Sequence, residues 1–364
     1  MVDTIPPQAQ NGRGAVSAPE GRFERYTSVT TDDGWMGTLL QEEEWEQKLK
    51  TNLHIDTSRT VINYITSPDV GQMRSINIYR GCEHGCIYCF ARPSHSYLGF
   101  SAGLDFETEI FYKPDAPQVL LRELAAKNYQ PETITLGSNT DCYQPVERGL
   151  GLTRRIVEIL AQYNHPLMII TKSALVARDI DILAPMAAKG LAKVALSLTT
   201  LDPDLARVME PRAAAPYRRL ATIKALSDAG IPVMVMTAPL IPALTDMEME
   251  NLLEAAFEHG ARSAAYTVVR LPHELKNLFE EWLRTHRPER ASHVLSLIRQ
   301  VRGGKLYNAE WGERMVGTGP YADLISQRFD LACKRIGFNK QKSYLRRDLF
   351  NPPGQNGQIA FQFN

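Results

Sequence analysis

The chain has 364 residues, of which 44% are hydrophobic and 23% charged, and its 41 basic and 41 acidic side chains leave no formal net charge. This composition is typical of a globular protein with a sizeable core and excludes a collagen-like or largely disordered chain. No segment approaches the roughly 18 apolar residues of a membrane span, and the first residues, MVDTIPPQAQNGRG, contain no apolar signal-peptide core. We therefore expect a cytoplasmic protein without a membrane partner.

The first seventy residues predict an N-terminal extension rather than a domain. Residues 1–20 are rich in Pro, Gln, Gly, Ala and Ser, which predicts a flexible tail. A short helix is expected over residues 38–49 and an extended segment over residues 60–65. The apolar content of residues 1–70 is too small for an independent core.

From residue 76 onward, β-branched apolar segments alternate with segments of helical period. Strands are expected over residues 76–79, 133–136, 167–171, 193–199, 233–237 and 264–269, and helices over residues 118–127, 152–163, 174–189, 217–229 and 246–259. Unbroken apolar runs such as LMII and VMVM are typical of parallel strands that helices cover. Gly190, Gly230 and Gly260 stand where helices should end. Six consecutive units over residues 71–270 predict a parallel α/β fold, either a partial barrel or a doubly wound sheet.

Residues 271–364 predict a helical C-terminal region with a basic tail. Helices are expected over residues 272–286 and 288–301. Residues 334–350 contain six basic side chains and a single acidic one, Asp348. The basic residues are Lys334, Arg335, Lys340, Lys342, Arg346 and Arg347, and the aromatic residues Phe338, Tyr344 and Phe350 lie between or beside them. This mixture suits a nucleic-acid backbone with exposed bases. It equally suits a solvated segment whose aromatic side chains pack on the fold.

Three of the five cysteines, Cys82, Cys86 and Cys89, lie directly after the first expected strand with the spacing C-x3-C-x2-C. In a reducing compartment such a group is more often metal-binding or catalytic than cross-linked. A cubane iron–sulfur cluster with full protein ligation needs four thiolates, so three thiolates on one loop leave one iron open. An open iron can chelate the amino and carboxylate groups of S-adenosylmethionine (SAM) and pass an electron to its sulfonium, which generates a 5′-deoxyadenosyl radical.

Two other interpretations of the cysteines stay open. A structural zinc site would need His84 or His95 as its fourth ligand, because no second cysteine pair is present. An inert group of buried cysteines is the other. The eight histidines form no HExxH pair, so nothing supports a hydrolytic zinc enzyme.

The cysteine spacing, with the aromatic Tyr88 before its last cysteine, resembles the radical S-adenosylmethionine superfamily. The segments RGCEHGCIYCFARPSH, TLGSNTDCYQPVE, IITKSALVARD, LSLTTLD and TAPLIPALTD are similar to its branch related to spore photoproduct lyase, over residues 76–270. The resemblance implies a partial (β/α)6 barrel, a 4Fe–4S cluster on the three cysteines, SAM as second cofactor, and an external electron donor of the flavodoxin or ferredoxin type. Only part of the lyase pattern is present, so the substrate is not identified.

In barrels of parallel strands, chemistry lies at the C-terminal strand ends. Lys172 and Ser197, at two expected strand ends, are candidates for the SAM carboxylate, in line with the matching lysine and serine of the family. Asn139 and Asp141 are candidates for its amino group or ribose, and Tyr88 is a further candidate contact. The plain alternative is a solvated lysine and a serine that caps the next helix. Other polar residues at these ends are Ser138, Thr140, Thr199, Thr200, Thr237 and Arg270.

Cys142 and Tyr143 lie on the same expected loop. A thiol can return a hydrogen atom to a substrate radical, so Cys142 is a candidate donor with Tyr143 as its relay. The lyase's donor cysteine does not occupy this motif, and small unpaired cysteines are often inert core residues. The turn Glu210-Pro211-Arg212 either reaches the substrate or forms a salt-bridged turn.

The sequence therefore predicts a radical SAM enzyme that abstracts hydrogen from an unknown substrate, with a nucleic-acid base or nucleotide as a candidate. The alternative is a non-catalytic nucleic-acid-binding protein that keeps the cluster as a structural or redox element. A zinc protein is the third hypothesis.

Overall fold

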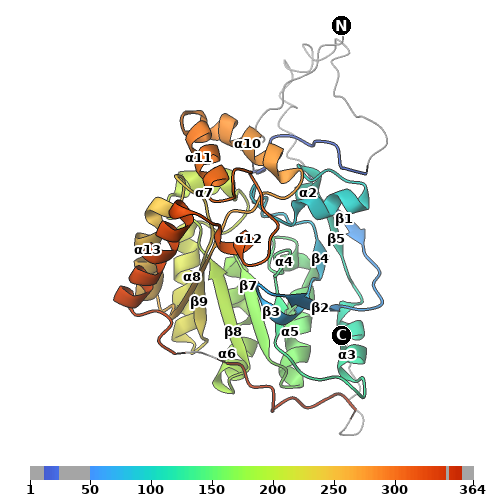
Figure 1. Cartoon of the computed structure of the whole chain (residues 1–364). Helices are drawn as coiled ribbons and strands as arrows, with labels where there is room; N and C mark the ends of the chain where they lie inside the picture. The colour runs from blue at the N-terminus through green and yellow to red at the C-terminus, as the bar shows by residue number, and fades with distance from the viewer. Residues whose placement is uncertain (1–11, 24–49, 342–343, 355–364) are drawn as a thin grey trace.

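A curved sheet of seven strands forms the centre of the fold in the computed structural model, which describes residues 12–23, 50–341 and 344–354 (Figure 1). The strand order is β10-β9-β8-β7-β6-β3-β2, and only β2 (Ile62–Ser67) runs antiparallel to its neighbour. The six parallel strands are β3 (Gly71–Ile76), β6 (Ile134–Leu136), β7 (Leu167–Thr171), β8 (Ala192–Ser197), β9 (Val233–Leu240) and β10 (Ser263–Val268). This curled half-barrel confirms the predicted partial barrel and excludes the doubly wound sheet.

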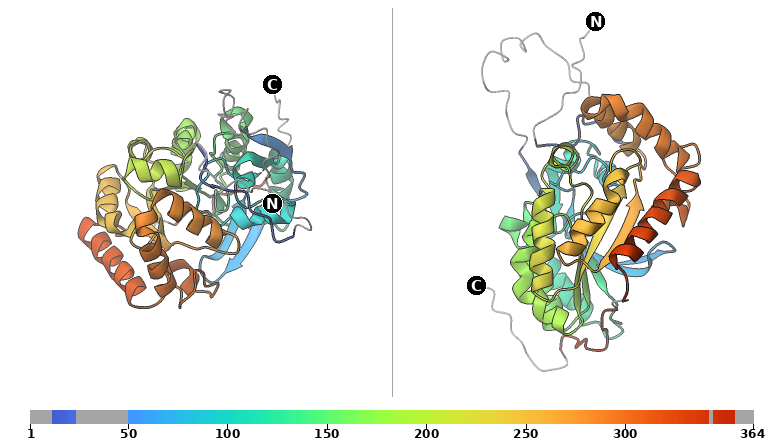
Figure 2. Two further views of the ribbon diagram at one scale, coloured as in Figure 1. Left: turned by 90° about the horizontal axis from the view of Figure 1, so that it is seen from above. Right: turned by 90° about the vertical axis from the view of Figure 1, so that its left-hand side faces the viewer.

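Helices cover the outside of the sheet, as the view from above shows (Figure 2). They are α3 (Ala116–Leu124), α5 (Leu152–Gln162), α6 (Ile180–Ala188) after the 3-10 helix η3 (Ala174–Asp179), α8 (Pro216–Asp228), and α9 (Met249–Glu258) after η4 (Asp246–Glu248). Their buried side chains, such as Ile156 and Leu226, share one apolar core with strand residues such as Leu196. Gly190 and Gly230 follow α6 and α8 with φ of 72° and 76°, which confirms the helix ends expected there.

The first barrel strand lies earlier in the chain than predicted. The expected strand over residues 76–79 is wrong, because β3 ends at Ile76 and the next pairing residues form β4 (Tyr79–Arg80). β4 belongs to a separate three-stranded sheet with β5 (Glu109–Tyr112) and β1 (Asn52–Ile55). Residues 76–79 (INIY) are more apolar than residues 71–76 (GQMRSI), which is why the sequence pattern favours them. The backbone of residues 71–76 forms the strand, because it pairs with both β2 and β6.

Two helices beyond the barrel cover its upper end in Figure 1, where the parallel strands have their C-termini. They are α10 (Leu275–His286) and α11 (Pro288–Gln300), close to the helices expected over residues 272–286 and 288–301. Trp282 of α10 shares a second apolar core with Met209 of α7 (Pro203–Met209) and with Ile87 between the cysteines. The shorter helices are η2 (Arg92–Leu98), α2 (Asp105–Thr108), α4 (Glu147–Leu150) and α12 (Glu313–Val316).

Residues 12–23 form an ordered segment, which we call the N-terminal strap. The backbone N–H groups of Gly14 and Ala15 donate to the Glu107 carboxylate over 3.0 and 2.8 Å, and Ala15 is 1% exposed. The predicted flexible tail is therefore wrong from residue 12 onward, because a buried carboxylate fixes this segment despite its polar composition. Residues 1–11 and the expected helix over residues 38–49 lie outside the described residues.

The described part of the C-terminal segment, residues 344–354, lies at the opposite, lower end of the barrel (Figure 1). Helix α13 (Pro320–Ile336) packs beside α9, and it includes two of the basic residues assigned to the tail, Lys334 and Arg335. The later residues run below the strands, where Arg346 N–H donates to Gly190 O over 2.9 Å and the Phe350 ring lies 5.3 Å from the His165 ring. Phe350 thus packs on the fold. Within the described residues, no helix has both the length and the apolar character needed to cross a membrane.

Candidate functional site

A cavity of about 330 Å³ lies at the upper ends of the parallel strands, and Cys82, Cys86 and Cys89 all line it. The five residues predicted to contact SAM line the same cavity, and these are Tyr88, Asn139, Asp141, Lys172 and Ser197. They come from the cysteine loop and from the ends of β6, β7 and β8. The structure therefore brings together eight of the ten predicted site residues.

The cysteine loop, residues 82–89, is held by its own turns and by a buried arginine. Gly85 N–H donates to Cys82 O over 3.3 Å, and Cys89 N–H donates to Cys86 O over 3.2 Å. Arg92 donates to the carbonyl oxygens of Cys86 and Gly85 over 2.8 and 2.9 Å. Its guanidinium also pairs with the Glu107 carboxylate, and both side chains are 0% exposed. This pair fixes the loop backbone and the N-terminal strap together.

The loop is fixed on a second side by Glu83. Its backbone N–H donates to Gln144 Oε1 over 2.9 Å, and its carboxylate accepts from Val146 N–H over 2.7 Å. Arg212 pairs with the same carboxylate over 2.9 Å and donates its backbone N–H to His84 O. The motif TLGSNTDCYQPVE and the Glu210-Pro211-Arg212 turn thus both orient the cysteine loop. Of the two alternatives for the Glu210-Pro211-Arg212 turn, the structure shows the salt-bridged one.

Tyr88 is anchored by a buried acid–base pair. Its hydroxyl donates to the Glu210 carboxylate, which also accepts from Thr199 Oγ1 over 2.8 Å and pairs with Arg219. Glu210 and Arg219 are 2% and 1% exposed. Lys172 Nζ lies 5.6 Å from the centroid of the Tyr88 ring. The Tyr88 ring therefore forms a fixed wall beside the Lys172 ammonium.

Asp141 connects the cysteine loop to the end of β7. Its two oxygens accept from Tyr143 N–H, Thr171 Oγ1 and Lys172 N–H over 2.7–2.9 Å, and one lies 3.3 Å from His84 Nδ1. Burial alone would raise the pKa of this carboxyl, but His84 and the hydrogen bonds lower the pKa to about 2. Asp141 is therefore an ionised side chain whose acceptor positions are already used within the protein.

Cys142 and Tyr143 do not line the cavity. Both are buried in the barrel core, with exposures of 3% and 0%, and the Tyr143 hydroxyl donates to Asp179 over 2.9 Å. Burial raises the pKa of the Cys142 thiol well above its usual value. This position resembles that of an inert core cysteine, so the donor role stays a prediction without support from the geometry.

Segments outside the parallel strands supply a wall of the cavity that the sequence did not indicate. Asp69, in the turn between β2 and β3, accepts from Gly312 N–H over 2.6 Å and pairs with Arg314 of α12. Val70 and Met315, beside these two residues, both line the cavity. Because α12 also contacts β10, this connection joins the two edges of the half-barrel. No local sequence signal could have paired residues 245 positions apart.

The residues present fit a cluster better than a single zinc ion. Among the residues that the structure describes, no three His, Cys, Asp or Glu side chains converge on one ion position. His84 Nδ1 lies 3.3 Å from Asp141, and His95 Nε2 lies 2.9 Å from Glu109 O, so each of the two candidate fourth ligands has one ring nitrogen engaged within the protein. The three cysteines of a cubane bind three different irons and need not converge.

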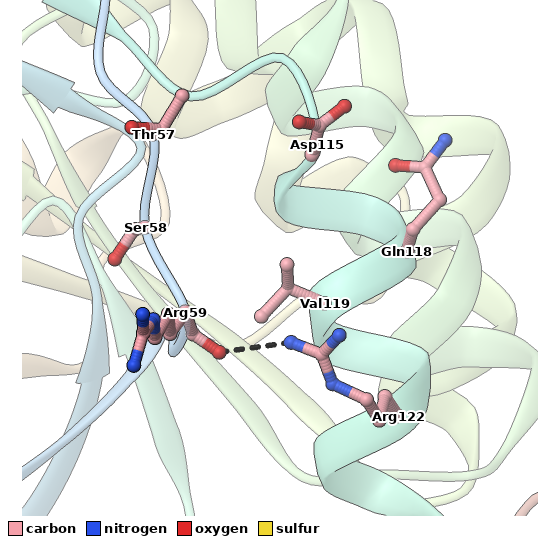
Figure 3. Close-up of a pocket in the computed structure, with 7 residues that line it drawn as sticks. All are labelled: Thr57, Ser58, Arg59, Asp115, Gln118, Val119 and Arg122. Atoms are coloured by element: carbon pink, nitrogen blue, oxygen red, sulfur yellow. Dashed lines mark hydrogen bonds between the residues drawn. The ribbon is translucent and has the colours of Figure 1, made fainter.

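A second hollow, of about 590 Å³, lies between α3 and the segment after β1 (Figure 3). Arg122 of α3 reaches across it and donates to the backbone oxygen of Arg59 over 2.9 Å. No cysteine lines it, and its walls contain none of the predicted site residues. It therefore has no part in the site described above.

Comparison with known proteins assigns the chain to a family. The model of the radical SAM superfamily matches residues 76–256. The chain belongs to the radical SAM superfamily. An uncharacterized protein of Mycobacterium tuberculosis is 39% identical over 228 residues, which cover 62% of this chain and 67% of that protein. Membership makes this chain a radical SAM enzyme, a class that uses a 4Fe–4S cluster, SAM and an electron donor.

Solved structures agree with the fold. Spore photoproduct lyase complexed with dinucleoside spore photoproduct superimposes with a TM-score of 0.55 at 16% identity, over 78% of this chain and 79% of the lyase. A variant of the lyase with bound AdoMet and the same dinucleoside gives 0.55 at 15% identity over the same shares. At this identity the likeness concerns the fold alone.

Proposed function

We propose that Cys82, Cys86 and Cys89 hold a 4Fe–4S cluster with one open iron, and that SAM binds beside it in the upper cavity. The observation that carries the proposal is that the three cysteines and all five candidate SAM contacts line this one cavity. When bound, the cluster supplies the electron that breaks a C–S bond of SAM and so forms the radical that abstracts hydrogen from the substrate.

Within this proposal, the protein's side chains have separate tasks. Lys172 and Ser197 bind the SAM carboxylate, because the Lys172 ammonium lines the cavity and has no carboxylate partner among the described residues. Asn139 contacts the amino group or ribose. Tyr88 and Asp141 act as positioning residues, since both are already bonded to neighbouring side chains. Apolar side chains such as Ile170 and Met236 exclude water from the cavity.

The proposed division of the chain follows these tasks. The barrel, residues 71–270, carries every candidate cofactor contact. The N-terminal extension, residues 1–70, and the helical C-terminal region, residues 271–364, supply the wall that contains Val70 and Met315. The electron donor is an external flavodoxin or ferredoxin, and a cytoplasmic setting keeps the thiols reduced. The substrate is a nucleic-acid base or nucleotide, in analogy with the dinucleoside that spore photoproduct lyase binds.

Anaerobic reconstitution tests the proposal. We expect the wild-type protein to bind iron and sulfide, to give the electron paramagnetic resonance signal of a reduced 4Fe–4S cluster, and to release 5′-deoxyadenosine from SAM after reduction. Cys82→Ser should lose the iron and the signal, whereas Cys333→Ser, which removes a buried cysteine of α13, should retain both. A colourless, iron-free protein after reconstitution would contradict the cluster, and a loaded protein that releases no deoxyadenosine would contradict the chemistry.

Cys142→Ser tests the donor role separately. If Cys142 returns hydrogen to the substrate radical, this variant changes the products formed without changing the iron content. An unchanged product distribution would remove Cys142 and Tyr143 from the reaction.

A further inference from the structure

Two guanidinium groups line one wall of the upper cavity, and a third donates to the backbone of that wall. Arg270 follows β10 and lines the cavity together with Arg314 of α12. Arg302 is 1% exposed and does not itself line the cavity. Arg302 donates to the backbone oxygens of Val268 and Val269 over 2.9 and 2.8 Å. It binds no carboxylate within the described residues.

The wall contains too few carboxylates for its charge. Asp69 pairs with Arg314, and the Glu313 carboxylate accepts from Asn308 over 2.8 Å instead of pairing with an arginine. Arg314 has a carboxylate partner, whereas Arg270 and Arg302 have none among the described residues. Burying an uncompensated charge is costly. An anionic ligand would remove that cost.

Arg270 is the member of this group that a ligand can reach. Its guanidinium lies 4.3 Å from the centroid of the Phe90 ring, and no hydrogen bond or ion pair to it is found in the described part of the chain. The ring contact is on one side of the guanidinium, whose five N–H donors have no hydrogen-bond acceptor among the described residues. Phe90 directly follows Cys89 in the chain, so Arg270 lies close to the cysteine loop.

We propose that Arg270 binds an anionic group of the substrate, a phosphate or a carboxylate, inside the upper cavity. The remainder of the ligand is apolar or aromatic, because Phe90, Met236 and Met315 line the same space. The inference rests on the proposed function, in which Lys172 and Ser197 already serve the SAM carboxylate. It defines the substrate class as an organic anion with an apolar part.

Phenyl phosphate, benzoate and the neutral benzyl alcohol are suitable probes, because they share one ring and differ in the charged group. We would titrate each into cluster-loaded, SAM-saturated protein and follow binding by calorimetry. At least one anion should bind more tightly than benzyl alcohol, and the preferred anion identifies the phosphate or the carboxylate as the recognised group. If neither anion binds better than the alcohol, the proposal is overturned.

Arg270→Gln should weaken binding of the preferred anion by about 10- to 100-fold, because a charged hydrogen-bond donor is lost. Arg262→Gln is the matched control, since Arg262 also stacks on a ring at 4.3 Å, that of Phe257, but lies before β10 at the lower end. Arg270→Lys keeps the charge and should lose less affinity than Arg270→Gln. If Arg270→Lys binds the anion, a loss of affinity in Arg270→Gln reflects the missing charge and not a misfolded cavity wall. Equal anion affinity in wild type and Arg270→Gln would overturn the proposal.

SAM affinity separates this inference from the one on which it rests. Arg270→Gln should weaken binding of the preferred anion by a much larger factor than binding of SAM, which Lys172 and Ser197 hold. If SAM binding falls while the anion still binds, Arg270 serves the SAM carboxylate and the inference is overturned. If the wild-type protein binds no cluster but still binds the anion through Arg270, the proposed function fails while the anion site stands.

Discussion

The two ends of the barrel use charged side chains in opposite ways. At the upper end, the pairs Arg92–Glu107 and Arg219–Glu210 are almost completely buried and hold the cysteine loop. At the lower end, the Arg347–Glu132 pair connects the C-terminal segment to the barrel, and its side chains are 56% and 41% exposed. Buried pairs cost desolvation and are weak evidence for stability alone, so those around the cysteines are best explained by the orientation that they impose. The basic C-terminal tail therefore lies at the end of the barrel opposite the cysteines, although its composition alone suggests a functional role.

The largest effect should follow from breaking a buried pair at the upper end. Glu107→Gln leaves the Arg92 guanidinium buried without its counter-charge and weakens the bonds to the strap, so the free energy of unfolding should fall by about 3–5 kcal/mol. Glu132→Gln, the matched change at the lower end, should cost only about 0–1 kcal/mol. Urea unfolding of both variants checks the difference. Equal losses would show that burial does not separate the two ends.

A buried histidine should make the lower end sensitive to acid. His165 is 0% exposed, and burial, assisted by the charge of Arg74, lowers its pKa from 6.5 to about 4. Below pH 6.5 the unfolded chain binds a proton that the folded chain does not accept, so stability falls as the pH drops. The loss reaches about 3 kcal/mol near pH 4, from the 1.4 kcal/mol that each pKa unit represents.

Unfolding experiments between pH 7 and pH 4 measure this loss. His165→Gln should flatten the pH dependence by that amount, while His293→Gln, which replaces an exposed histidine, serves as the control. If His165→Gln and the wild type lose stability in parallel, burial does not hold the pKa of His165 below its usual value.

A smaller effect is expected where the N-terminal strap touches the cysteine loop. A Cβ atom at Gly14 would lie 1.8 Å from Gly85 O, so Gly14→Ala must displace the strap or the loop. We expect a loss of about 1–3 kcal/mol and faster bleaching of the reconstituted protein in air. Gly149→Ala is the control, because nothing lies within 4 Å of a Cβ there. Bleaching at the same rate in both variants would show that the strap does not protect the loop.

The smallest effect is expected in the basic tail. Arg347→Gln removes an exposed ion pair and should change the free energy of unfolding by less than about 1 kcal/mol, with no change in deoxyadenosine release. The same variant tests the nucleic-acid hypothesis. If the tail binds single-stranded DNA, affinity falls with salt concentration and falls again in Arg347→Gln. Salt-independent binding, or none, would leave the tail with a packing role only.

Local patterns predicted the parts of this molecule that depend on local interactions. The cysteine spacing and the strands β6 to β10 followed from short motifs and apolar periodicity, and Lys172 and Ser197 followed from their positions at strand ends. The N-terminal strap did not, because its order depends on a carboxylate at Glu107. The sequence could not predict that Arg270 lacks a carboxylate partner among the described residues. This depends on Asp69, which pairs with Arg314 and not with Arg270. The sequence also could not predict that the Cys142 side chain lies in the core and not in the cavity. Its orientation depends on the path of an irregular loop, whose sequence has no apolar periodicity.

The connection between Asp69 and α12 links the start of the barrel to a segment made long after its last strand. A chain that stopped short of residue 312 would contain the three cysteines of the cysteine loop and every parallel strand of the barrel, yet the upper cavity would lack the wall that Arg314 and Met315 supply. During synthesis, the protein therefore completes the wall of this cavity only after the whole barrel has been translated.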